Sequence, residues 1–318
     1  MFERILVPLD GSRRAEQALP IAARLARASR GTIVLLRVVS IPNEIVSYLA
    51  LEPIPTRDDI GAAREEARNY LDGMATGRSL VGIHSETEVI LGQAAAAILS
   101  AVNAHHIDLI VLCSHGYTGL TRWFVGSVAE KVVHHSPVPV LVLREGGPLP
   151  VGPHPDAGSP WRVLVPLDGS ARAQAAVAPA AQLIAALSAP ARGALHLTRV
   201  EVQPDPDEIS HHKREAMIHK AKEYLGTTTE QIREGLAADL AADLRLAITW
   251  SVTLDEDIAS GIIRAAEDGS DVIAMTTHGS HGLPRWVMGS ITGQVLHATG
   301  LPLLIVRPPD MIDKTHQT

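Results

Sequence analysis

The feature that most constrains this chain is an internal repeat. The segment ILVPLDGSRRA at residues 5–15 returns as VLVPLDGSARA at 163–173, and VPVLVLR at 138–144 returns as LPLLIVR at 301–307. A sequence that carries the same pieces twice in the same order is expected to fold as two copies of one structural unit. The 318 residues are enough for two domains of ordinary size.

A stretch rich in proline and glycine separates the two copies. Residues 145–160 read EGGPLPVGPHPDAGSP, with five prolines and four glycines among 16 residues. Proline lacks the backbone N–H that helices and sheet ladders need, so this stretch is predicted to be a linker. We therefore expect a first domain at residues 1–144, the linker at 145–160, a second domain at 161–310 and a tail at 311–318.

Short apolar runs alternate with helical patterns in both copies. In the first copy we expect strands at 5–7, 33–39, 83–91, 107–112 and 138–143, and helices at 12–29 (with a kink at Pro20), 57–75, 94–104 and 127–135. In the second copy the strands are expected at 163–165, 194–200, 246–254, 272–275 and 303–306. Such strands predict an α/β fold of two tandem doubly wound domains, each a five-stranded parallel sheet with helices on both faces.

The loop after the fourth strand also recurs. LIVLCSHGYTGLTRWFVGS at 109–127 and VIAMTTHGSHGLPRWVMGS at 272–290 share His-Gly, Arg-Trp and Gly-Ser in the same order. Glycine lets a backbone approach a ligand closely, and the N–H groups at a helix start favour anions. We therefore predict a phosphate-binding loop in each half.

The first strand of each copy ends in Pro-Leu-Asp-Gly-Ser. In open parallel sheets, ligands bind beyond the carboxyl ends of the strands, where the strand order reverses. If strands one and four are neighbours, Asp10 faces the same crevice as the first glycine loop. Asp168 then faces the second loop in the same way.

Composition and missing motifs exclude several classes of protein. The formal net charge is −7 and no long basic run occurs, which argues against nucleic-acid binding. Cys113 is the only cysteine, so neither an intrachain disulfide nor a cysteine metal cluster can form. Without a signal-peptide core or an apolar run long enough for a bilayer, we expect a cytoplasmic protein with no membrane partner. The adjacent histidine pairs lack metal-ligand spacing, so no metal site is expected, and no P-loop, dinucleotide or nucleophile-elbow motif occurs.

These motifs resemble the universal stress protein family in its tandem two-domain form. The resemblance covers nearly the whole chain and rests on the first-strand motif, the ends of the second strands, the glycine loops and the closing strands. It implies a Rossmann-like fold of the adenine nucleotide alpha hydrolase type. The ATP-binding branch of the family carries Gly-x2-Gly-x9-Gly-Ser/Thr. Here the second and third glycines are present, whereas Cys113 and Thr276 replace the first.

The resemblance implies that ATP, with or without magnesium, or another adenine nucleotide is the ligand, in a protein of stress tolerance. The aspartates would meet the adenine or ribose, the second-strand valines the base, and the glycines and serines the phosphates. The residues expected to bind are Pro8, Leu9, Asp10, Val38, Cys113, His115, Gly116, Gly126, Ser127 and Val128 in the first half, and Pro166, Leu167, Asp168, Val200, Thr276, His278, Gly279, Gly289, Ser290 and Ile291 in the second. Family members commonly pair two domains through their fifth strands. The two halves can make this pairing internally, and a homodimer of the whole chain would also be compatible.

The same residues also allow interpretations in which they have a structural role and bind no ligand. Asp10 and Asp168 suit an Asp-Gly turn or a helix cap, and Ser127 begins Ser-Val-Ala-Glu, the pattern of a capping box. The loop histidines suit exposed positions as well as phosphate contacts, while Trp123 and Trp286 favour packing or an interface wall. Cys113 is expected to be an inert small residue.

Two other functions also remain: a stress protein that acts through protein contacts without a nucleotide, and a slow ATP hydrolase or nucleotidyl transferase. No paired base and nucleophile is evident in the sequence, so we expect no fast enzyme. Cys113 is small and Thr276 is β-branched, so we expect the first half to bind more tightly than the second.

Overall fold

The structure, a computed structural model, describes residues 2–40, 56–114, 125–151, 154, 159–203, 211–239, 246–277 and 288–308. The first half contains β1 (Arg4–Leu9), α1 (Arg13–Glu16), α2 (Ala18–Ser29), β2 (Thr32–Val39), α4 (Arg57–Ala75), the 3-10 turn η1 (Arg78–Leu80), β3 (His84–Leu91), α5 (Ala94–Ala104), β4 (Leu109–Ser114), α6 (Ser127–His135) and β5 (Val140–Arg144). The second half contains β6 (Arg162–Pro166), α7 (Ala171–Gln174), α8 (Val177–Ser188), β7 (Gly193–Val202), α9 (His211–Asp239), β8 (Leu246–Asp255), α10 (Ile258–Glu267), β9 (Val272–Thr276), α11 (Ser290–Ala298) and β10 (Leu303–Val306).

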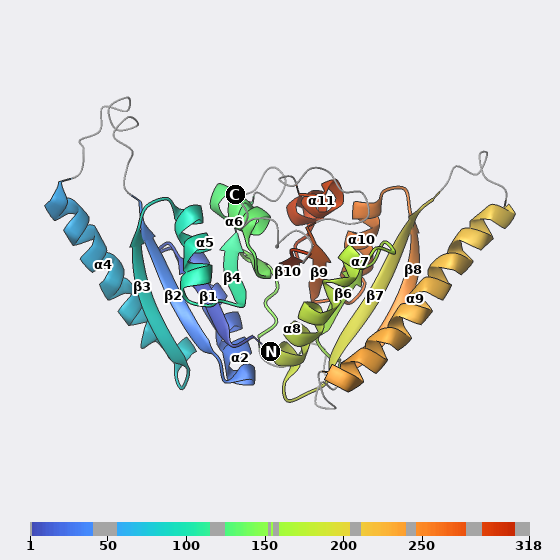
Figure 1. Ribbon diagram of the computed structural model, residues 1–318, viewed down its shortest axis with the longest axis horizontal. Helices are drawn as coiled ribbons and strands as arrows, with labels where there is room; N and C mark the ends of the chain where they lie inside the picture. The colour runs from blue at the N-terminus through green and yellow to red at the C-terminus, as the bar shows by residue number, and fades with distance from the viewer. Residues whose placement is uncertain are drawn as a thin grey trace, which may run out of the picture.

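All the strands belong to one ten-stranded sheet, in the order β3-β2-β1-β4-β5-β10-β9-β6-β7-β8 (Figure 1). Within each half the neighbouring strands are parallel, which confirms the predicted α/β fold. At the centre, β5 and β10 run antiparallel, with Leu141 opposite Leu304. The pairing of fifth strands that the family resemblance implies therefore occurs inside this chain.

Helices cover both faces of the sheet in two layers. Buried residues of α2, α4, α8 and α9 pack on one face, and those of α5, α6, α10 and α11 pack on the other. Leu6 and Val7 are consecutive residues of β1 with no exposed surface, and each packs into a different layer. Because successive side chains of a strand point to opposite faces, a sheet covered on both sides requires such continuous apolar runs.

The predicted helix at 12–29 is two helices, with a break at Gln17. Pro20 is the third residue of α2, and the ring of a proline clashes with the carbonyl group four residues earlier, which here belongs to Glu16. The helix therefore ends and restarts before the proline. The second half repeats this arrangement, because α7 ends at Gln174 and Pro179 is the third residue of α8.

Two predicted strands are displaced by two residues at one or both ends. The fourth strand was expected at 107–112, but β4 begins at Leu109, because the Asp108 carboxylate turns back to accept hydrogen bonds from the backbone of Glu3 and Arg4. It also extends beyond the apolar run, since Ser114 still pairs with Arg144 in the backbone ladder. The predicted strand at 138–143 is β5 at 140–144, because the Val138 backbone N–H donates to the Ser136 hydroxyl before the strand and Arg144 pairs with Ser114 at its end.

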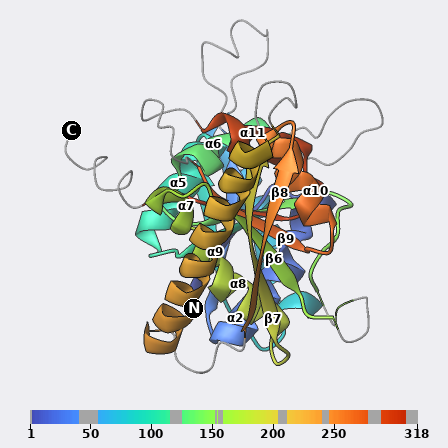
Figure 2. The ribbon, with the colours of Figure 1, turned by 90° about the vertical axis from the view of Figure 1, so that its right-hand side faces the viewer.

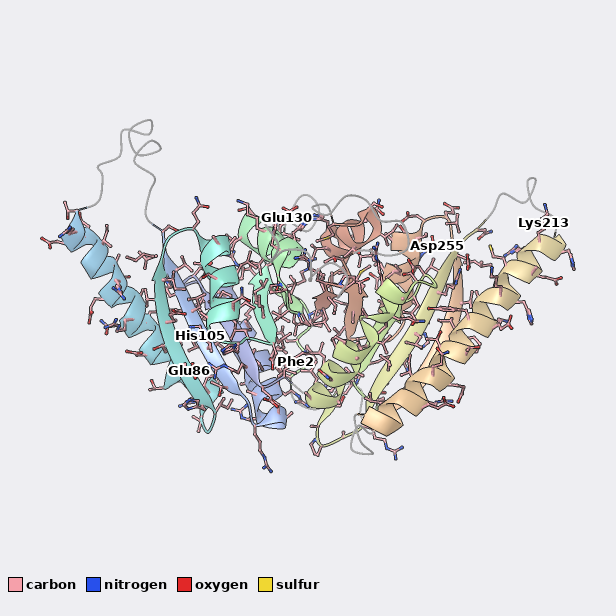
Figure 3. The ribbon with its side chains drawn as sticks, in the orientation of Figure 1. Phe2, Glu86, His105, Glu130, Lys213 and Asp255 are labelled. Carbon is pink, nitrogen blue, oxygen red and sulfur yellow. The ribbon has the colours of Figure 1, made fainter. Side chains whose placement is uncertain are left out.

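The two outer edges of the sheet are β3 and β8. On β3, Glu86 lies 2.8 Å from Nη2 of Arg4, and Glu88 lies 2.6 Å from Nε2 of His105 (Figure 3). Charged side chains on an edge strand discourage pairing with another chain. The long helix α9 runs along β7 and β8 in the other half (Figure 2). Within the described ranges, no helix is both long enough and apolar enough to cross a membrane.

Candidate functional site

The neighbouring positions of β1 and β4 bring the predicted motifs of the first half together. These strands pair directly, with Leu6 opposite Ile110, so both end at the same edge of the sheet. A cavity of about 220 Å³ lies at this edge. Every described residue predicted for the first site lines it, namely Pro8, Leu9, Asp10, Val38, Cys113, Gly126, Ser127 and Val128. His115, Gly116 and Trp123 lie outside the described residues, so their roles stay predictions.

The second half has a matching cavity of about 350 Å³ at the ends of β6 and β9. It is lined by all the described residues predicted for the second site, namely Pro166, Leu167, Asp168, Val200, Thr276, Gly289, Ser290 and Ile291. Thr276 is only 5% exposed, and this cavity is the larger of the two. Crowding by Thr276 therefore gives no reason for weaker binding in the second half. His278, Gly279 and Trp286 lie outside the described residues.

Both cavities have further lining residues that the sequence analysis did not predict. In the first, the additional lining residues are Arg14, Ala15, Leu36, Ala94, Ile98, Leu112, Ser114 and Ala129. In the second they are Ala173, Ile258, Ile262, Met275 and Thr292. Ala94 and Ile98 lie four residues apart at the start of α5, and Ile258 and Ile262 have the same spacing in α10. This spacing puts the two residues of each pair on one helix face, and the sequence could have predicted from it that they line the cavity.

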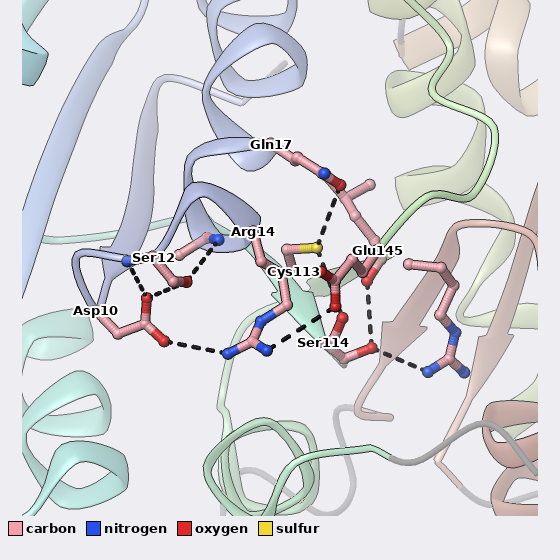
Figure 4. A network of polar contacts seen from close by, with 10 residues as sticks. Asp10, Ser12, Arg14, Gln17, Cys113, Ser114 and Glu145 are labelled. Carbon is pink, nitrogen blue, oxygen red and sulfur yellow. Dashed lines mark hydrogen bonds and ion pairs between the residues drawn. The ribbon is translucent and has the colours of Figure 1, made fainter. Parts of the chain in front are cut away.

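Asp10 forms a turn at the end of β1 and also lines the cavity. Its Oδ1 atom accepts hydrogen bonds from the backbone N–H of Ser12, at 2.9 Å, and from the Ser12 hydroxyl. Its Oδ2 atom lies 3.4 Å from Nη2 of Arg14 (Figure 4). Partial burial opposes ionisation, but these hydrogen bonds and the Arg14 charge lower the pKa of Asp10 below its ordinary value. Asp10 is therefore a carboxylate at neutral pH, held in place by Ser12.

Asp168 makes the same turn in the second half. Its Oδ1 atom accepts hydrogen bonds from the Ser170 backbone N–H at 2.9 Å and from the Ser170 hydroxyl at 2.6 Å. Each serine hydroxyl in turn accepts a bond from a helix backbone, Ser12 from Ala15 at 3.2 Å and Ser170 from Ala173 at 3.1 Å. The serines are thus the helix caps, and each aspartate holds its cap through one carboxylate oxygen.

The helix at each glycine loop begins without a side-chain cap. Gly126 is the N-cap of α6, with φ −58° and ψ 146°, and Ser127 is the first helical residue. The capping-box interpretation of Ser127 is therefore wrong, because Gly126 already has the extended backbone of the cap and accepts the first helical bond, from Glu130 at 3.0 Å. Gly289 and α11 have the same geometry.

An uncapped helix start leaves backbone N–H groups of its first turn without an intrahelical partner. In α6 and α11 this turn lies in the lining of a cavity. These N–H groups, together with the positive end of the helix dipole, suit a phosphate group.

Asp10 and Arg14 are the charged side chains among the described residues that line the first cavity. The Arg14 guanidinium lies between Asp10 and Glu145, with its Nη1 atom 3.9 Å from Oε2 of Glu145 (Figure 4). Cys113 Sγ lies 3.9 Å from Oε1 of Gln17. Burial raises the pKa of the Cys113 thiol to about 12, so the thiol is neutral and acts as a small packing residue. Among the described residues, no group of three or more His, Cys, Asp or Glu side chains has a metal-binding arrangement.

The sequence profile of the universal stress protein family matches residues 1–144 and 161–307. The chain belongs to the universal stress protein family. The universal stress protein Slr1230 of Synechocystis is 25% identical over 329 residues, which cover 96% of this chain and 100% of that protein. Universal stress protein YxiE of Bacillus subtilis is 29% identical over 148 residues, covering 45% of this chain and 100% of YxiE.

Solved protein structures share this fold. The crystal structure of a universal stress protein from Archaeoglobus fulgidus matches with a TM-score of 0.65 and 20% identity, over 96% of this chain and 98% of that one. At this identity the match shows a shared fold. Both this structure and Slr1230 match across the two halves, so the tandem arrangement of universal stress protein units is shared along their lengths.

Proposed function

We propose that each half of this universal stress protein binds an adenine nucleotide, with ATP as the first candidate, and that the nucleotide acts as a conformational ligand in stress tolerance. The observation that carries this proposal is the repeated juxtaposition of a strand-end aspartate with an uncapped helix start in one cavity. Asp10 and Gly126 line the first cavity, and Asp168 and Gly289 line the second.

The two ends of each cavity suit different parts of a nucleotide. Val38 and Ile98 supply an apolar wall in the first cavity, as Val200 and Ile262 do in the second, and an adenine ring would pack there. The aspartate at the end of the first strand would accept a hydrogen bond from a ribose hydroxyl. The phosphates would lie against the first turn of α6 or α11, where backbone N–H groups have no intrahelical partner. Magnesium would then be carried by the phosphates.

The arrangement supports binding more than fast catalysis. The Cys113 thiol is held neutral by burial, and one oxygen of each cavity aspartate already accepts bonds from a serine. A carboxylate committed to a turn is a poor general base, because the same hydrogen bonds stabilise its ionised form. We propose that hydrolysis, if it occurs, is slow compared with binding and release.

Calorimetric titration of the purified protein with ATP tests the proposal, together with mass spectrometry for a nucleotide that co-purifies. Two binding events per chain are expected, each weakened by substitution of the aspartate in its own cavity. No heat in either half would favour the alternative that the protein acts through protein contacts. Several ATP turnovers per second that disappear in Asp10→Ala would instead favour an enzyme.

A further inference from the structure

The helices α6 and α11 begin at the two cavities in the same way but are attached to the sheet differently. They lie on either side of the centre of the molecule (Figure 1). They are equivalent in the repeat, since residues 126–136 correspond to 289–299. Each contributes its first turn to the lining of one cavity. A difference in how firmly the helices are held is therefore a difference between the two cavities.

Two hydrogen bonds attach the start of α11 to the end of β9. The Thr292 hydroxyl donates to the carbonyl oxygen of Thr276 at 2.8 Å. The backbone N–H of Gly289 donates to the carbonyl oxygen of Thr277, also at 2.8 Å. Because Thr292 is only 4% exposed, breaking its bond would leave a buried hydroxyl and a buried carbonyl without partners. The first turn of α11 is thus fixed against the sheet.

A third hydrogen bond holds the other end of α11. Arg144 of β5 is fully buried, and its Nη2 atom donates to the carbonyl oxygen of Leu296, in the last turn of α11. Its Nη1 atom donates to the Ser114 hydroxyl at 3.0 Å. The helix dipole also favours a cation at this end. One side chain of the first half therefore joins β4 and β5 to α11 of the second half.

None of these three bonds has a counterpart at α6 among the described residues. The first is lost because Ala129, which has no hydroxyl, occupies the threonine position. The second is missing because the N–H of Gly126 does not bond to the carbonyl oxygen of Ser114. Arg307 is the equivalent arginine, and it makes no hydrogen bond to Val133 in α6. The sheet thus holds α6 less firmly than α11 at all three places.

The sizes of the cavities differ in the same sense. The second has about 350 Å³, within the range of about 300–1,000 Å³ that is usual for small-molecule sites, whereas the first has about 220 Å³. The first cavity must therefore widen to admit a nucleotide. The side chains that α6 buries are Ala129, Val132 and Val133. Apolar contacts have no preferred direction, so α6 can slide over the sheet and widen the cavity.

We propose that the first half is the nucleotide-responsive half of the protein and that the second half holds a preformed site. This inference rests on the proposed nucleotide function. Binding at the first site moves α6, and the free energy of that opening lowers the apparent affinity there. At the second site α11 is already in position, so binding needs little rearrangement. The second site therefore fills at a lower nucleotide concentration than the first, the reverse of the order expected from Cys113 and Thr276.

Hydrogen exchange of the full chain, measured by mass spectrometry on peptides from α6 and α11, tests the proposal. Protection factors remove the intrinsic exchange rates of the two sequences. Without ligand, we expect amides 130–133 of α6 to be at least about tenfold less protected than amides 293–296 of α11. Saturating ATP should raise the protection of α6 at least about tenfold and that of α11 less than about threefold.

Thr292→Val removes one attachment of α11 at nearly constant side-chain volume. The protection of α11 should fall about tenfold, because a buried hydrogen bond is lost. The matched control is Thr229→Val. Thr229 is similarly buried, and its hydroxyl donates to the carbonyl oxygen of Leu225 within α9 at 2.7 Å. This control should change the protection of α11 less than about twofold.

Equal protection of the two helices in the ligand-free protein would overturn the proposal, as would a larger effect of ATP on α11 than on α6. If Thr292→Val fails to fold, the comparison of the two helices in the unaltered protein decides alone. A calorimetric titration with ATP that gives no heat would strike the nucleotide function, whereas the ligand-free exchange still measures the difference in attachment. The two failures are therefore distinguishable.

Discussion

The two cavities that we propose bind nucleotide have the same backbone arrangement but different lining side chains. The first has a volume of about 220 Å³ and an arginine, Arg14, in its lining. The second has a volume of about 350 Å³, and no arginine occurs among its described lining residues. Ile258 in the second cavity corresponds to Ala94 in the first, whereas Thr276 and Thr292 take the places of Cys113 and Ala129. In the proposed function, the duplicated backbone would position the nucleotide in both halves, and the lining side chains would set how much charge contributes to each affinity.

The same divergence appears at the end of the second strand in each half. Arg37 lies over the ring of Tyr70 at 5.2 Å, and its buried Nη1 atom has no hydrogen-bond partner among the described residues. Arg199 lies over Tyr224 at 5.5 Å, but it also forms a 2.6 Å ion pair with Glu201, where the first half has Val39. The second half thus pairs this arginine with a carboxylate, whereas no ion pair of Arg37 occurs among the described residues.

The largest expected effect is on the alkylation rate of Cys113, the one thiol of the chain, which lines the first cavity. With the pKa of Cys113 near 12, the thiolate fraction at neutral pH is about 1000-fold lower than for an ordinary thiol. We expect iodoacetamide to react with Cys113 about 1000-fold more slowly in the folded protein than in urea. Mass spectrometry of the alkylated protein measures both rates. Thr276→Cys in a Cys113→Ser background is the matched probe of the second cavity, and equally fast labelling in folded and unfolded protein would contradict the buried, neutral thiol.

Filling one cavity at a time should separate the two sites. Gly126→Val and Gly289→Val each place a branched side chain at the helix start that we propose holds phosphate, and each should weaken ATP binding in its own half about 100-fold. Calorimetry should then show one remaining binding event in each single variant. If either substitution abolished both events, the cavities would not be independent.

Arg14 should make the first site more dependent on phosphate charge than the second. Arg14→Ala removes a cation from the cavity lining, and we expect ATP affinity at the first site to fall about tenfold, with a smaller change for AMP. The corresponding Arg172→Ala is the control, because Arg172 is not among the residues that line the second cavity. Equal losses in the two variants would mean that general charge, and not the cavity lining, causes the effect. The difference should shrink at high salt.

The smallest effect concerns the glycines that follow the two aspartates. Gly11 and Gly169 have φ values of +83° and +94°, so alanine at either position should destabilise the fold by about 1 kcal/mol. A Cβ at Gly11 would also overlap Nη1 of Arg37, whereas one at Gly169 would lie 3.1 Å from Nη1 of Arg199. Urea unfolding should therefore show a larger loss for Gly11→Ala. A larger loss for Gly169→Ala would contradict this comparison.

Sequence reasoning predicted the features that depend on the backbone. The repeat, the strand-end Asp-Gly-Ser turns and the Gly-Ser helix starts indicated the fold and most of the described residues around both cavities. It misassigned the cap at Ser127, because a serine at the first helical position and one at the N-cap look alike in sequence. The loop histidines, Gly116 and Gly279 lie outside the described residues, so their roles stay predictions.

Features that depend on tertiary contacts were not predictable in this way. Arg14 looks like any exposed helical residue until β4 and Glu145 are placed beside it. The contact between α2 and α8, where Arg24 donates to the carbonyl oxygen of Leu187, joins residues that are far apart in the chain. Local patterns carry no information about such contacts, whereas the turn and helix-start motifs are local by nature.

The antiparallel contact between β5 and β10 has a consequence for how the protein behaves at low abundance. Two separate subunits joined along the same edge would come apart on dilution and could exchange with other copies. Here a covalent tether keeps the partners at high effective concentration, so the association cannot be titrated away. Each molecule therefore always presents one pocket of each kind, in a fixed one-to-one ratio, whatever the expression level of the protein.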